Sequence, residues 1–192
     1  LFRSSRELHF YLIIPYSILL LICVFSTNTG IFWRFMVRYL CYVYLVCCDQ
    51  EECYLMKKNR ISLSEYQRAF LSRIIAIPSV GGTSEEGAPY GREPRLVLQT
   101  FLEEAKAKGF RTGVVGDRAG WAEIGQGDKL LGIICHLDVV PVGDGWDSDP
   151  FSLCFREEER GKPSMYARGI VDDKGPACAA YFAIDRKSTR LN

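Results

Sequence analysis

An apolar run that ends abruptly in polar residues is the feature that most constrains the fold of this chain. Residues 130–135 read Leu-Leu-Gly-Ile-Ile-Cys, and His136 and Asp138 follow at once. The run is short and rich in isoleucine, which is typical of a β-strand buried on both faces. Polar side chains at the carboxyl end of such a strand point into the crevice where α/β proteins bind ligands. The sequence therefore predicts an α/β fold with a site at the end of this strand.

The spacing of His136 and Asp138 indicates a metal-binding pair. Side chains alternate along an extended backbone, so residues two apart face the same side. A carboxylate beside a metal-bound imidazole accepts the free ring N–H, which fixes the tautomer and orients the ring. The alternative is a core histidine whose ring is satisfied by Asp138 without any metal. These two residues alone leave both interpretations open.

A second acidic pair, Asp172-Asp173, precedes Lys174-Gly175-Pro176 and a run of small and apolar residues over 177–184. The composition of that run predicts a helix. Side chains of adjacent residues diverge in regular structure, so only one of the two carboxylates should serve a metal directly. Either aspartate would also suit the N-cap of the helix. Both roles can coexist on the two residues.

Further motifs accompany these residues in a fixed order. The chain reads His-Leu-Asp-Val-Val-Pro-Val-Gly-Asp-Gly-Trp over 136–146, Asp-Pro-Phe over 149–151 and Ala-Arg-Gly-Ile-Val-Asp-Asp-Lys-Gly-Pro over 167–176. This series resembles the dinuclear metallopeptidases, the superfamily of peptidase V, carnosinase, glutamate carboxypeptidase and acetylornithine deacetylase. Ile-Pro-Ser-Val at 77–80 and Glu-Gly-Ala-Pro-Tyr-Gly at 86–91 are more similar to the bacterial dipeptidases around peptidase V than to the deacetylases.

The resemblance, which covers roughly residues 60–185, implies a fold and a set of roles. The fold is the N-terminal part of a metallopeptidase catalytic domain, an incomplete mixed sheet covered by helices. His136 would bind one of two divalent metal ions, zinc or manganese, and Asp172 would bridge both. Asp138 would be the catalytic carboxylate that orients His136, with Asp173 and Lys174 shaping the loop. In such proteins the peptide bond after the bridging aspartate is often cis.

The resemblance also implies a function and a gap. The implied activity is hydrolysis of a dipeptide by a water activated between two metals. The family's general base belongs to a Glu-Glu pair beyond Asp172, followed by a further Asp and a distant His. The chain as given is expected to end before any of these residues, and its other histidine is His9. We therefore expect the chain as given to be truncated and inactive. The alternatives are an N-acyl amino acid deacylase, acting on small N-acyl amino acids, and a non-catalytic membrane-tethered module.

The N-terminal segment differs in composition from the rest. Residues 9–26 and 31–48 are apolar runs, and Met56 reads like a natural start just before the resemblance begins. Residues 1–55 are interpreted as upstream translation or else a membrane anchor, with a membrane partner expected only if 9–48 is a real anchor. Residues 56–185 form the expected catalytic part, and the polar residues 186–192 are interpreted as a non-native tail.

The net charge and the cysteine spacing limit which partners and which cellular compartment are expected. The formal net charge is +1, which provides no electrostatic basis for binding nucleic acid. The eight cysteines show no disulfide or zinc-knuckle spacing, which fits a reducing compartment. The sequence thus predicts a cytoplasmic protein, or a membrane-anchored one if the N-terminal segment is an anchor.

Local patterns predict the remaining elements. Ser64 and Gln67 form a capping box before a helix that stops at Pro78. A second helix is expected from Pro94 to a C-cap at Gly109. Strands are predicted over 110–115, 121–124 and 130–135, and a hairpin over 152–156 and 164–167.

Overall fold

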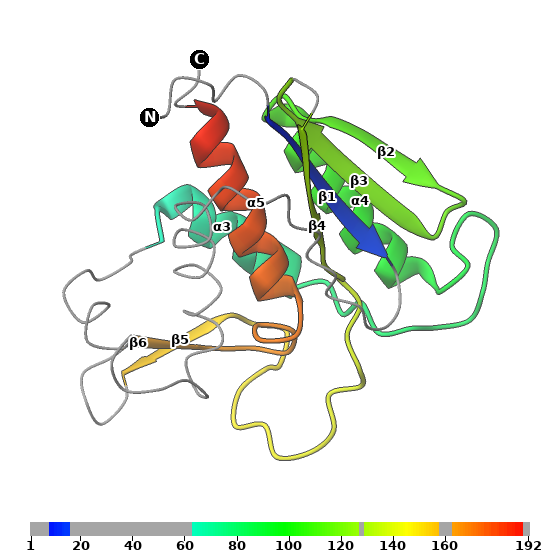
Figure 1. Cartoon of the computed structure of the whole chain (residues 1–192). Helices are drawn as coiled ribbons and strands as arrows, with labels where there is room; N and C mark the ends of the chain where they lie inside the picture. Colours follow the sequence, from blue (N-terminus) through cyan, green and yellow to red (C-terminus); the bar gives the residue numbers. More distant parts are fainter. Residues whose placement is uncertain (1–7, 16–62, 127–128, 158–162, 190–192) are drawn as a thin grey trace.

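The computed structural model describes residues 8–15, 63–126, 129–157 and 163–189. Figure 1 shows how the described elements are arranged. In chain order they are β1 (Leu8–Pro15), α3 (Glu65–Ile75), α4 (Arg92–Ala107), β2 (Arg111–Val115), β3 (Ala119–Ile124), β4 (Lys129–Ile134), β5 (Cys154–Glu157), β6 (Pro163–Tyr166) and α5 (Lys174–Thr189). Each predicted helix and strand is present, with its ends moved by a few residues.

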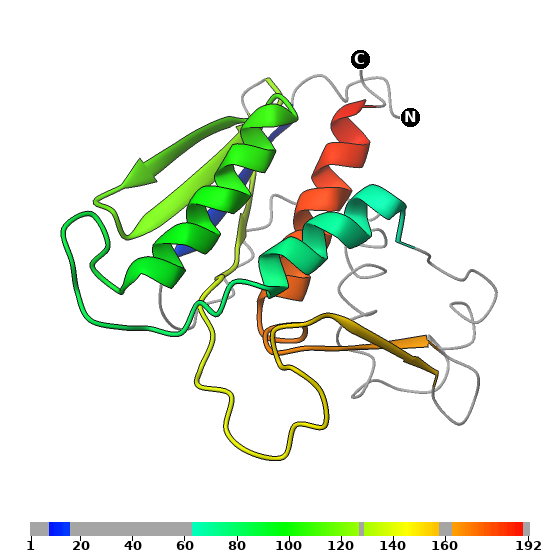
Figure 2. The ribbon, with the colours of Figure 1, turned by 180° about the vertical axis from the view of Figure 1, so that it is seen from behind.

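The main sheet is mixed, as the sequence predicts. Its strand order is β2-β3-β1-β4, and β5 and β6 form a separate two-stranded antiparallel sheet. β4 is parallel to β1, whereas β2 and β3 pair antiparallel. α4 runs along one face of the main sheet, α5 lies beside β4, and α3 packs against α5, as Figures 1 and 2 show from opposite sides. The chain is therefore an α/β structure with helices packed on a mixed sheet.

β1 comes from the N-terminal segment and lies between β3 and β4. It pairs antiparallel with β3 and parallel with β4. Residues Leu8–Pro15 thus form a strand within the segment interpreted as upstream translation or else a membrane anchor. Within the described ranges, no helix is long and apolar enough to cross a membrane. The boundary at residue 55 itself stays a prediction, because most of the segment lies outside the described residues.

Capping residues explain where two helices begin and end. Ser64 accepts a hydrogen bond from the amide of Gln67, whose side chain accepts one from the amide of Ser64, so the predicted capping box is confirmed. α4 begins at Arg92, and Pro94 lies in its first turn. At the other end, Gly109 has φ +86°, a left-handed conformation that glycine adopts without a steric cost.

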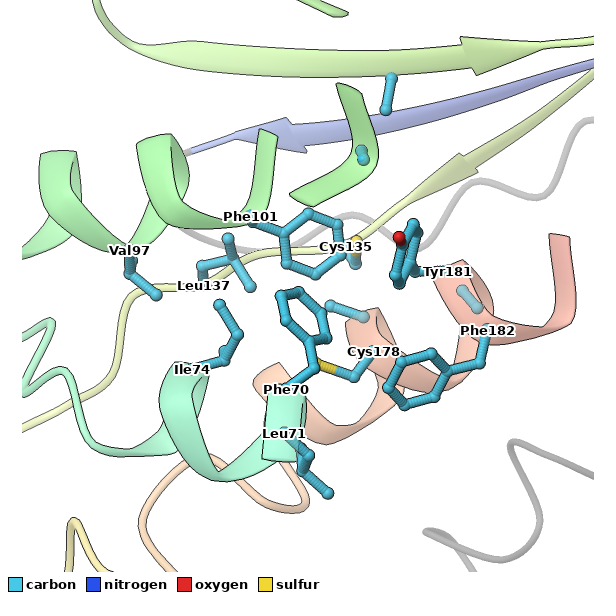
Figure 3. Close-up of a cluster of buried hydrophobic side chains, with 14 of the residues drawn as sticks. Phe70, Leu71, Ile74, Val97, Phe101, Cys135, Leu137, Cys178, Tyr181 and Phe182 are labelled. Atoms are coloured by element: carbon cyan, nitrogen blue, oxygen red, sulfur yellow. The ribbon is translucent and has the colours of Figure 1, made fainter. Parts of the chain in front are cut away.

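The hydrophobic core lies between the three helices and the adjacent face of the sheet. Figure 3 shows its aromatic centre, where Phe70, Phe101, Phe182 and Tyr181 converge from α3, α4 and α5. The ring of Tyr181 has no exposed surface and lies 5.4–5.6 Å from the rings of Phe70, Phe101, Phe110 and Phe182. α5 thus supplies the centre of the core.

β4 is buried on one face only, which corrects the expectation of a strand buried on both. Leu131 packs against the core and Ile133 is 9% exposed, whereas Leu130 is 57% exposed. The reason is that the described helices pack against only one side of this strand. The alternation continues past the last strand residue, since Cys135, Leu137 and Val139 are buried and the residues between them are half-buried.

α5 is longer than the predicted run. It begins at Lys174 and continues to Thr189, past the expected boundary at residue 185. The helix end and the boundary drawn from composition therefore do not coincide. The interpretation of residues 186–192 as a non-native tail stays a prediction.

Candidate metal centre

The candidate site forms where the extension of β4 meets the segment before α5. His136 and Asp138 follow β4 on the side of the chain that faces away from the core. Asp172 and Asp173 directly precede Lys174, the first residue of α5. The backbone amide of His136 donates a hydrogen bond to Asp173 Oδ2 at 3.0 Å, which joins the two segments. The structure thus brings together every site residue that the sequence predicts.

The imidazole of His136 lies between two aspartates. Its Nε2 is 3.0 Å from Asp172 Oδ1. On the other side of the ring, Nδ1 is 3.1 Å from the backbone oxygen of Asp138 and 3.3 Å from its Oδ1. Asp138 therefore holds Nδ1 and leaves Nε2 directed at Asp172, which is the orientation expected of a metal-binding histidine with a supporting carboxylate.

The aspartates raise the pKa of His136 to about 9 from its ordinary value of 6.5. The main cause is hydrogen bonding to Asp138, which favours the protonated ring against the opposing effect of burial. The charges of Asp138 and Asp173 and the contact with Asp172 add to the rise. The protonated, positively charged form of the ring is thus favoured by its surroundings.

The two adjacent aspartates differ in their surroundings. The side chain of Asp172 is 84% exposed, whereas that of Asp173 is half-buried. Burial raises the pKa of Asp173 to about 6, against the opposing effects of the His136 amide and ring. The peptide bond between the two residues is cis, as the resemblance implies. Asp172 is therefore the more exposed of the two carboxylates, and Asp173 accepts a hydrogen bond from the backbone amide of His136.

Among the described residues, Oδ1 of Asp138 makes no hydrogen bond of good geometry, and its contact is the 3.3 Å approach to Nδ1 of His136 that raises the pKa of the ring. This oxygen is buried. An imidazole nitrogen together with carboxylate oxygens is a donor set that suits zinc or manganese. Within the described residues, no group of three or more His, Cys, Asp or Glu side chains is arranged to hold a metal ion. The residues fit part of a metal site, with His136 and Asp172 as the available ligands.

Two buried polar contacts hold the backbone at the site. The resemblance implies that Lys174 shapes the loop, but neither contact itself was predicted from the sequence. Ser79 Oγ donates to the backbone oxygen of Leu137 at 2.6 Å. Lys174 Nζ donates to the backbone oxygen of Ile77 at 2.5 Å, and burial lowers the pKa of this lysine to about 8. The motif over 77–80 was the available signal, but it carries no chemistry of its own.

The loop over residues 141–150 follows Asp138 and Val139 along the chain. Arg168 holds it through hydrogen bonds and a contact with an aromatic ring. The Arg168 guanidinium donates to the backbone oxygens of Pro141 and Val142 and lies 5.3 Å from the centre of the Trp146 ring. The amide of Arg168 donates to the oxygen of Pro150 at 2.7 Å. Trp146 Nε1 also donates to Val142. One residue therefore contacts both ends of this loop.

Gly169 provides a first testable prediction, because it packs between the two segments. A Cβ at Gly169 would lie 2.9 Å from Val139 Cγ1 and 3.1 Å from Lys174 Cδ, and its φ is +80°. We expect Gly169→Ala to lower the free energy of unfolding by about 1–3 kcal/mol in a urea titration. Gly116→Ala is the matched control, since its φ is +56° but no atom lies within 4 Å. Equal losses for both variants would show that the packing at Gly169 contributes nothing.

Comparison with known proteins gives one matching family model and several similar proteins. Residues 132–191 match the model of Peptidase family M20/M25/M40. Proteins of Staphylococcus aureus strains USA300 and Mu50 / ATCC 700699, each named "Putative dipeptidase", are 47% identical to this chain over 116 residues. The match covers 59% of this chain and 24% of each relative, so the chain spans about a quarter of the length of the curated relatives it matches.

Proposed function

We propose that the chain is part of the catalytic domain of a metal-dependent dipeptidase. The support is that residues 132–191 match the model of Peptidase family M20/M25/M40 and that relatives named "Putative dipeptidase" are 47% identical to the chain over 116 residues. The proposed substrate is a dipeptide, and the proposed reaction is hydrolysis of its peptide bond. One observation carries the proposal. Nε2 of His136 lies 3.0 Å from Asp172 Oδ1 while Asp138 holds the opposite ring nitrogen.

We propose that His136 and Asp172 bind the metal ions and that Asp138 orients the imidazole. By holding Nδ1–H, Asp138 keeps the lone pair of Nε2 available on the side of Asp172. The carboxylate of Asp172 is exposed enough to offer both oxygens. When bound, two divalent ions, zinc or manganese, would polarise the scissile carbonyl and lower the pKa of the attacking water. Because the described residues contain no group of three or more His, Cys, Asp or Glu side chains arranged to hold a metal ion, we propose that the remaining ligands and the general base come from other parts of the protein.

A chimera tests this function. Residues 63–185 of this chain replace the matching segment of the Staphylococcus aureus USA300 relative, and dipeptide hydrolysis is followed with zinc or manganese present. We expect turnover comparable to that of the unaltered relative, and a loss of at least about a thousandfold in His136→Ala and Asp172→Ala, because each removes a metal ligand.

Asp117→Asn is the control for the chimera, since Asp117 lies on the turn between β2 and β3 and its side chain is 52% exposed. This variant should retain full turnover. Turnover that survives His136→Ala would refute the proposed site. If the chimera hydrolysed N-acyl amino acids and not dipeptides, the proposed dipeptidase activity would be wrong and a deacylase activity would take its place.

We further propose that the 192-residue chain alone does not hydrolyse dipeptides, because His136 and Asp172 supply only part of the ligand set. A cytoplasmic location is proposed as well. Its support is that Cys135, Cys154 and Cys178 are free thiols in the described part of the chain.

A further inference from the structure

The backbone on both sides of Asp138 is fastened to a single residue, Ser79. Its hydroxyl donates to the oxygen of Leu137 at 2.6 Å, and its backbone oxygen accepts from the amide of Val139 at 3.0 Å. Val80 and Val139 then form an isolated parallel bridge. Ser79 has no exposed surface, so both contacts are made away from water. Asp138 is thus the residue that the two hydrogen bonds enclose.

The same short loop is also fastened to the segment that carries Asp172. Lys174 follows Asp173 directly, and its Nζ donates to the oxygen of Ile77 at 2.5 Å. Lys174 has no exposed surface, and the carbon chain of this lysine packs against Gly169. One loop, residues 77–80, therefore contacts both segments of the site, through Ser79 on one side and through Ile77 on the other.

We propose that Ser79 and Lys174 are positioning residues that act through the loop of residues 77–80. Ser79 sets the direction of the Asp138 side chain toward His136, and Lys174 sets the distance of Asp172 from the same histidine. This inference rests on the proposed metal-binding role of His136 and Asp172. It adds two residues that touch neither metal nor substrate.

The physical reason lies in the cost of an unpartnered buried carbonyl. Without the Ser79 hydroxyl, the buried oxygen of Leu137 has no other hydrogen-bond donor among the described residues, and leaving it unpaired away from water is unfavourable. The chain then relaxes by turning this peptide unit, which moves the next residue, Asp138. The contact between Asp138 and Nδ1 of His136 is lost as a consequence.

The metal-free chain provides the first measurement. The Nδ1–H proton of His136 is observed by NMR and assigned through its loss in His136→Gln, which is feasible because the chain has 2 histidines. We expect a protected signal, shifted downfield, in the unaltered chain. Ser79→Ala should abolish it, whereas Ser79→Thr, which retains the hydroxyl, should keep it.

Zinc binding provides the second measurement, by titration of Zn²⁺ alone into the full chain with the His136 imidazole signals as the readout. We expect the Kd to rise about 10–100-fold in Ser79→Ala and to stay near the original value in Ser79→Thr. Val97→Ala is the control for general destabilisation, because Val97 is a buried residue of α4. It should lower Tm and leave both readouts unchanged.

The Lys174→Met variant distinguishes two effects of Lys174 on Zn²⁺ binding, that of its positive charge and that of its contact with Ile77. Removing a buried positive charge near the site should by itself tighten Zn²⁺ binding, whereas losing the contact with Ile77 should weaken it. We expect weaker binding by about tenfold, with the Nδ1–H signal of His136 retained because Ser79 still holds Asp138. Binding that is tighter or unchanged would overturn the role of Lys174.

The two proposals fail in different ways. If Zn²⁺ leaves the His136 signals of the unaltered chain unmoved, the proposed metal site is wrong, and the Nδ1–H signal still tests Ser79. If Ser79→Ala keeps that signal, or if the readouts follow Tm across Ser79→Ala, Ser79→Thr and Val97→Ala, the positioning role of Ser79 is wrong.

Discussion

Tyr181→Ala is expected to lower the free energy of unfolding by about 3–5 kcal/mol, measured by urea denaturation. The ring of Tyr181 has no exposed surface and contacts four other rings within the core. Truncation to alanine removes these contacts and leaves a cavity that α3, α4 and α5 enclose. The loss should exceed that of other single substitutions of α5 side chains.

Tyr181→Phe is the control, since it keeps the ring and removes only the hydroxyl. Tyr66 donates to Glu104 Oε1 at 2.7 Å, so Tyr181 donates to Tyr66 over their 3.2 Å separation. Losing this half-buried hydrogen bond should cost only about 0.5–1.5 kcal/mol. A similar loss for the two variants would mean that the ring does not support the core.

A second large effect concerns the protonation of His136. In the metal-free chain its NMR titration should have a midpoint near pH 9, because the folded pKa is raised to about 9. Asp138→Asn should move the midpoint toward the ordinary value of 6.5, since Asp138 is the largest cause of the rise. A midpoint near 6.5 in the unaltered chain would contradict the contact between Asp138 and the ring.

The sign of the linked effects follows from the raised pKa. The protonated ring stabilises the folded chain fully below pH 6.5, and this contribution is lost as the pH rises from 6.5 to about 9. Zn²⁺ has the opposite dependence, because it must displace the proton from Nε2. Its apparent affinity should therefore increase with pH up to about 9.

Local patterns account for most of the fold that could be predicted. The capping box at Ser64, the glycine after α4 and the turn-rich segments around β2 and β3 each act within a few residues. The pairing of β1 between β3 and β4 could not be predicted, because no local signal says which distant segment fills a sheet. The open face of β4 escaped prediction for the same reason, since Leu130 and Ile133 are both apolar and differ only in what covers them.

Some residues of the candidate site could also be predicted from the sequence, and others could not. His136, Asp138 and Asp172 could be selected from the sequence because their side-chain chemistry and spacing are distinctive. The hydrogen bond from His136 to Asp173, and the supports from Ser79 and Lys174, involve backbone groups far apart in the sequence. Backbone amides and carbonyls are the same at every position, so a sequence pattern does not reveal which of them a side chain will contact.

The contacts of Arg168 with residues 141–150 should determine how this loop moves. The hydrogen bonds of Arg168 reach Pro141 and Val142 at one end of the loop and Pro150 at the other, and all of them come from this one residue. Neither a helix nor a strand lies within this segment. The loop should therefore open and close as one cooperative unit, with its amides exchanging hydrogen together and not turn by turn.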